Sequence, residues 1–92
     1  MIITLKEVLH KSSDNGKGTL NEVAINSDHV VYVRPAQRPL LREDIETALD
    51  QRTEFSTIML SNGNGGIKMT VVGSPAVIES KVYSSKKQLL KG

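Results

Sequence analysis

The chain of 92 residues has no cysteine and no tryptophan, and its aromatic residues are two tyrosines and one phenylalanine. Without cysteine, disulfide bonds and thiolate metal sites are excluded. Three aromatic rings are fewer than the stacking platforms of single-stranded nucleic-acid binders usually need. No run approaches the ~20 apolar residues of a membrane span, and residues 1–6 lack the basic start of a secretory signal. We therefore expect a cytoplasmic protein without a membrane segment.

The length and charge of the chain favour one small domain. A chain of 92 residues can bury a single modest core. We predict one domain over residues 1–92, with a mobile polar loop at 10–18 and a mobile tail at 84–92. The formal net charge of +2 permits an anionic partner without requiring one.

Alternation predicts a strand at 19–26, and the β-branched and aromatic run at 30–33 predicts another. Two further strands are predicted at 55–60 and 67–72 on either side of a glycine-rich turn. Residues 1–9 also fit a strand, although a helix with Leu5, Val8 and Leu9 on one face is the alternative. Pro35 has no N–H to donate to a ladder, so it is expected to end the strand that begins at Val30. The glycine-rich residues 61–66 predict a hairpin turn.

Two segments have helical patterns. Residues 39–52 place Leu41, Ile45, Ala48 and Leu49 on one face, with Pro39 in the first turn. A second helix is predicted to begin at Pro75 with Ser74 as its N-cap. Together these elements predict an α+β fold in which an antiparallel sheet of four or five strands packs against two helices.

The expected core combines the apolar residues of the strands and helices. The hairpin at 55–72 is apolar on both faces, which indicates either helices on both sides of the sheet or a subunit interface. The residues expected to be buried are Ile3, Leu5, Val23, Ile25, Val31, Val33, Leu41, Ile45, Leu49, Ile58, Leu60, Val72 and Ile78.

Three runs resemble the FlbD-like family of small flagellar proteins: LNEVAINSDHVVYV, STIMLSNG and MTVVGSPAVIESKV. The matching positions are Asn26 and Val30 in the first run, Thr57, Ile58, Leu60, Asn62 and Gly63 in the second, and Val71 or Val72, Ser74 and Ile78 in the third. Residues 35–54 form an insertion relative to the short members of the family. The resemblance implies a small accessory or regulatory protein and assigns no functional residues.

The chemical motifs have simpler structural explanations. The turn at 61–66 is followed by a strand, whereas a phosphate-binding glycine loop opens a helix. A metal site would need His10 and His29 to converge with Asp14, Asp28 or another carboxylate, and without cysteine we expect no structural zinc site. The carboxylates of residues 43–50 fit a solvated helix face. We therefore predict no enzyme activity, no cofactor and no catalytic or metal-binding residues.

Basic residues are the remaining candidates for a binding site. Arg34, Arg38 and Arg42 surround the proline segment, and Lys81, Lys86 and Lys87 lie near the C-terminus. We predict a non-enzymatic protein-interaction or regulatory module of bacterial or phage origin that associates with itself or with another protein. The alternative is a small regulator that binds nucleic acid through these six residues.

Overall fold

The computed structural model describes residues 1–10 and 17–91, with the backbone alone for residues 85–91. Its elements are β1 (Ile2–His10), β2 (Gly18–Asn26), the 3-10 helix η2 (Ser27–His29), β3 (Val30–Ala36), α1 (Glu43–Ala48), β4 (Phe55–Ser61), β5 (Gly66–Val72) and α2 (Pro75–Lys91). All five strands pair antiparallel in the order β2-β1-β5-β4-β3. The predicted α+β class, with five strands and two helices, is confirmed.

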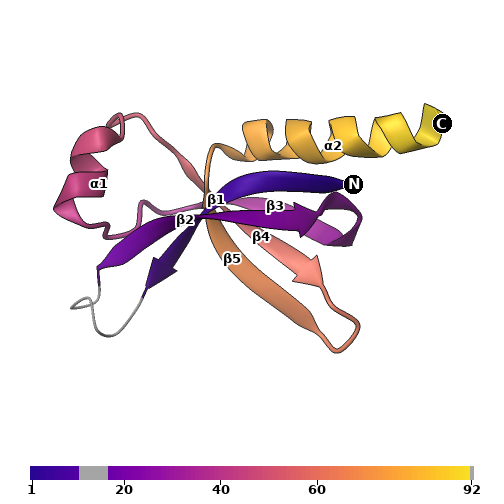
Figure 1. The fold of residues 1–92 in the computed structure, drawn as a ribbon, viewed down its shortest axis with the longest axis horizontal. Helices are drawn as coiled ribbons and strands as arrows, with labels where there is room; N and C mark the ends of the chain where they lie inside the picture. The colour runs from indigo at the N-terminus through magenta and orange to yellow at the C-terminus, as the bar shows by residue number, and fades with distance from the viewer. Residues whose placement is uncertain (11–16, 92) are drawn as a thin grey trace.

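A narrow joint divides the sheet into two parts (Figure 1). β1 and β2 pair along their whole length, from Ile2 opposite Asn26 to His10 opposite Gly18. β1 and β5, in contrast, pair only at Glu7–Val71 and Val8–Thr70. The strands twist strongly at this joint, so the outer ends of the β1–β2 and β4–β5 hairpins diverge. The joint is therefore the only strand pairing that connects the β1–β2 ribbon to β3, β4 and β5 among the described residues.

One face of the sheet, here called the α2 face, carries the larger core cluster. Leu5, Ile25, Ile58, Val71 and Ile78 are buried together, and α2 supplies Ile78. Ile58 and Val71 are 0% exposed. Burying such an aliphatic side chain stabilises the fold by about 1.5–3 kcal/mol. Ser74 caps the helix as predicted, because its side-chain oxygen accepts a hydrogen bond of 3.2 Å from the N–H of Val77.

The opposite face, here called the α1 face, carries a second cluster. Val8 and Phe55 are buried against Leu41, and Ile45 and Leu49 pack around them. Since successive side chains of a strand point to opposite faces, Phe55 and Ile58 of β4 belong to different clusters. Segments on both sides therefore cover the doubly apolar hairpin at its base, around Phe55 and Val72, as one of the two predicted explanations requires, while its outer part is covered on the α2 face alone.

The helix predicted over 39–52 is shorter than expected. α1 begins at Glu43 and ends at Ala48, and Arg42 rather than Ser or Pro occupies the N-cap position. Residues 40–42 are instead drawn to the edge of β2, where the N–H of Gly18 donates to the carbonyl of Leu40 at 2.8 Å and the N–H of Arg42 donates to the carbonyl of Gly18 at 3.2 Å. These backbone bonds replace the first helical turn.

β3 differs from its prediction in two ways. The strand continues through Pro35 to Ala36, which is possible because β3 is an edge strand and the missing N–H costs no ladder bond on its open side. The register also shifts between Val30 and Tyr32. This bulge turns Val31 outward, so that it is 61% exposed and not part of the core. Val30 packs against the α2-face cluster instead.

The mobility of the two segments at 10–18 and 84–92 stays a prediction. Residues 11–16 of the predicted loop 10–18 and Gly92 of the predicted tail 84–92 lie outside the described residues. The backbone of the tail is helical through Lys91. No helix within the described chain is long and apolar enough to cross a membrane.

Candidate interaction surfaces

The six basic residues predicted as a binding site lie on different parts of the structure. Arg34 lies on β3, with its guanidinium carbon 4.2 Å from the ring centroid of Tyr32. Lys81 is an exposed residue of α2 on the other face of the sheet. Lys86 and Lys87 belong to the part of α2 described by its backbone alone. Lys81 and Arg34 therefore lie on different faces of the sheet.

Arg38 and Arg42 are held by the segment that leads into α1. Arg38 lies over the ring of Phe55 at 5.7 Å, and its Nη1 donates to the carbonyl oxygen of Thr53 at 3.4 Å. The Nε of Arg42 lies 3.5 Å from a carboxylate oxygen of Asp44. Both contacts are exposed, and an exposed ion pair contributes at most about 1 kcal/mol. These two arginines have structural partners and lie along the segment that covers the α1 face.

The uncovered part of the α1 face contains a basic and aromatic surface that the sequence prediction missed. Tyr32 is opposite Met59 and Met59 is opposite Lys68, while Arg34 is opposite Thr57 and Thr57 is opposite Thr70. These side chains point away from α2, because Val33, Ile58 and Met69 between them pack on the α2 face. No Asp or Glu occurs in β3, β4 or β5. The sequence could have predicted this surface only with the strand register known, because Arg34 and Lys68 then fall on the same face of the sheet.

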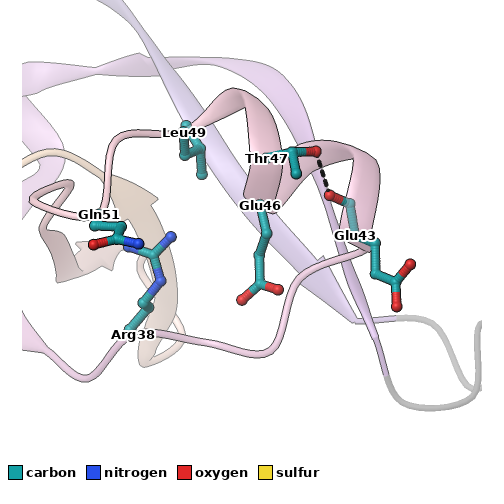
Figure 2. Close-up of a pocket in the computed structure, with 6 residues that line it drawn as sticks. All are labelled: Arg38, Glu43, Glu46, Thr47, Leu49 and Gln51. Carbon is teal, nitrogen blue, oxygen red and sulfur yellow. Dashed lines mark hydrogen bonds between the residues drawn. The ribbon is translucent and has the colours of Figure 1, made fainter.

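A wide depression borders α1 and is lined by Arg38, Glu43, Glu46, Thr47, Leu49 and Gln51 (Figure 2). Arg38, Gln51 and Glu46 all border the same opening there. The hydroxyl of Thr47 donates to the carbonyl oxygen of Glu43 at 2.6 Å, as a helix residue commonly does. All the polar lining residues are exposed. The depression therefore presents solvated side chains and does not gather buried groups for chemistry.

The two free edges of the sheet differ in how they are protected. β3 has a proline, a bulge and Arg34, and α2 packs beside it. Each of these features hinders the addition of another strand. β2 has the regular sequence GTLNEVAIN without proline, lysine or bulge. Among the described residues only Leu41 bridges to its outer side, at Gly18.

The hydrogen bonds at the two ends of β2 show which of its backbone N–H and C=O groups point toward β1 and which point outward. The N–H and C=O of Gly18 bond to residues 40 and 42, away from β1, while the N–H of Ser27 bonds to the carbonyl of Met1. Because the direction alternates along an antiparallel strand, even-numbered residues point outward and odd-numbered residues pair with β1. The N–H and C=O groups of Leu20, Glu22 and Ala24 thus face outward, and no described segment pairs with them.

Glu22 is the one charged side chain of β2, and a lysine faces it from the neighbouring strand. Lys6 is directly opposite Glu22 on β1. Opposite charges at this range offset one another, so the carboxylate of Glu22 repels an approaching strand less than an isolated charge would.

Comparisons with models of known protein families, with curated proteins and with solved structures found no match to the chain. The resemblance to FlbD-like proteins therefore stays a prediction.

Proposed function

We propose that the protein is a cytoplasmic, non-enzymatic interaction module of regulatory type that associates with itself. The observation that carries this proposal is the unprotected outer edge of β2. An unpaired row of backbone N–H and C=O groups is a template for another strand, and natural proteins usually block such an edge. Here β3 is blocked in several ways, whereas the outward groups from Leu20 to Ala24 pair with no segment that the structure describes.

The test uses Ala24→Pro, which removes one outward N–H. That N–H does not belong to the β1 ladder, and proline is tolerated on an edge strand when its nitrogen faces solvent. The monomer should therefore keep its fold, with an unchanged circular dichroism spectrum. Ala24→Thr is the matched control, because threonine keeps the N–H and favours strands.

Light scattering over a concentration series measures the outcome. We expect the molar mass of the wild type and of Ala24→Thr to approach twice that of the chain as concentration rises. Ala24→Pro should stay monomeric over the same range. A wild type that remains monomeric at every concentration, or an Ala24→Pro variant that associates equally well, contradicts the proposal.

A second candidate function is binding of nucleic acid by the uncovered α1 face. The observation that favours it is the carboxylate-free surface of β3, β4 and β5, where Arg34 stacks on Tyr32 and Lys68 lies two strands away. Cations contact phosphates, and an aromatic ring or a guanidinium plane stacks on bases. This surface differs from the six-residue cluster predicted from the sequence and shares only Arg34 with it.

A mobility-shift assay with single-stranded and duplex DNA at two salt concentrations tests this candidate. The double variant Arg34→Ala/Lys68→Ala should weaken binding. It should also make the plot of log binding constant against log salt concentration less steep, by the amount expected for about two lost phosphate contacts. Lys81→Ala, on the opposite side of the sheet, is the matched control and should bind like the wild type. Absence of salt-sensitive binding by the wild type would exclude the candidate.

A further inference from the structure

We infer that two copies of the chain join through antiparallel pairing of their β2 strands, with the two-fold axis at Val23. This inference rests on the proposed self-association and specifies its geometry. It follows from three features of β2: the length of the free edge, the position of Glu22 and the occupied end at Gly18.

The free length of the edge places the axis. Residues 40–42 already occupy the outward groups of Gly18, so no other segment of the described chain pairs with the edge from Leu20 to Asn26. Val23 is the midpoint of this stretch. An axis there pairs Leu20 with Asn26 of the partner subunit and Glu22 with Ala24 of the partner subunit. All the free outward positions are then used, and each chain extends the other's sheet.

Neighbouring registers are less favourable for identifiable reasons. An axis at Glu22 places the two Glu22 carboxylates directly opposite each other, which is destabilising. An axis at Asn21 places Ala24 of the partner subunit opposite Gly18, where Leu40 and Arg42 already form hydrogen bonds. An axis at Ala24 shortens the paired stretch by one residue pair at each end. The axis at Val23 avoids these conflicts and gives Glu22 the small Ala24 of the partner subunit as its neighbour.

Side-chain packing agrees with the same register. Val23 belongs to the α2 face and packs against its core cluster. Across the axis the two Val23 side chains form a non-hydrogen-bonded pair, in which side chains approach most closely. Apolar packing on the α2 face thereby continues from one chain to the other. A second copy is the occupant because its own β2 supplies this complementary sequence.

Cysteine cross-linking reports the register directly, since the chain has no cysteine of its own. In the proposed dimer the two copies of Val23→Cys have Cα atoms about 4.5 Å apart, within the range of a disulfide. Asn21→Cys lies on the same face, but its two copies are roughly 14 Å apart. Under mild oxidation we expect Val23→Cys to form disulfide dimers at least about tenfold faster than Asn21→Cys does. A non-reducing gel measures both rates.

A second pair of variants replaces exposed side chains on the α1 face. These replacements leave the packing of Val23 intact, so a change in core packing cannot explain their cross-linking. Glu22→Cys and Ala24→Cys lie opposite each other in the proposed dimer, about 5.5 Å apart between Cα atoms. Copies of either variant alone are about 8 Å apart, which is too far for a disulfide. An equal mixture should therefore cross-link faster than either variant alone.

The outcomes separate this inference from the proposed function. Faster cross-linking of Val23→Cys and of the mixture supports the Val23 axis. Faster cross-linking of Asn21→Cys overturns the Val23 axis and leaves self-association standing. The same conclusion follows if no cysteine variant cross-links while the wild type still associates and Ala24→Pro does not. A monomeric wild type without cross-linking, including one whose edge binds a foreign strand, overturns both.

Discussion

Gly73 illustrates how a single residue fixes the passage from the sheet into α2. Its φ of 127° belongs to a region that side-chain-bearing residues rarely adopt. Its N–H donates to the carbonyl of Glu54 at 2.8 Å, and its carbonyl accepts from the hydroxyl of Ser56 at 2.7 Å. A Cβ at this position would lie 3.0 Å from a terminal carbon of Ile78. Backbone conformation, hydrogen bonding and packing therefore all favour glycine here.

Gly73→Ala should lower the free energy of unfolding by about 1–3 kcal/mol, because alanine is strained at this φ. Urea denaturation followed by circular dichroism measures the change. Gly63→Asn is the control, since Gly63 has a φ of 88° in an open turn and asparagine tolerates positive φ. A loss for Gly73→Ala no larger than that of the control would contradict this account.

Val31 shows why some buried positions were predicted wrongly. Simple alternation places Val31 and Val33 on one face, but the bulge before Tyr32 changes the parity of the strand. Phe55, Val8 and Val71 were not in the predicted core, although all three are buried. Alternation predicts which residues share a face, but it does not show that a short segment elsewhere in the chain covers the second face.

At the scale of elements, strands were predicted more accurately than α1. The alternating runs and the turn at 61–66 produced strands and a hairpin as expected, with Gly63 and Gly65 at positive φ. The helical pattern of 39–52 was interrupted at its start because Gly18, far away in sequence, offers backbone bonds to residues 40–42. Such a contact depends on the tertiary structure, and helix propensity does not contain it.

The segment before α1 is attached by one of two adjacent leucines. Leu41 is 3% exposed in the α1-face cluster, whereas Leu40 is 74% exposed. Leu41→Ala should reduce the free energy of unfolding by about 2–5 kcal/mol, because it leaves a cavity beside Val8 and Phe55. Leu40→Ala is the matched control and should change it by less than about 0.5 kcal/mol. Equal losses in thermal or urea denaturation would mean that the segment docks differently.

For the whole molecule, self-association links thermal stability to concentration. A dimer of folded chains gains stability with each increase in protein concentration, because the partner binds the native state alone. We expect the Tm of the wild type to rise by about 3–5 °C for a tenfold increase in concentration. Scanning calorimetry should find a constant Tm for Ala24→Pro. A constant Tm in the wild type would argue against a dimer at those concentrations.

The candidate surfaces were less predictable from sequence than the fold. Basic residues close in sequence, such as Arg34 and Arg42, separate once the chain folds, while Arg34 and Lys68 come to lie on one face. The exposure of the β2 edge also depends on strand order, which places β2 and β3 at the two ends of the sheet. Local patterns determine which residues form strands, and only the assembled sheet determines which strand is left unpaired.

The joint between β1 and β5 also has a consequence for synthesis of the protein. β1 is made early, but its partner residues Val71 and Thr70 are made more than sixty residues later. At roughly 5–20 residues per second, the β1–β2 hairpin waits several seconds before β5 and α2 can cover Leu5 and Ile25. During that interval an apolar hairpin with two open edges is exposed on the ribosome. Nascent chains are therefore expected to need the protection of a chaperone until α2 has emerged.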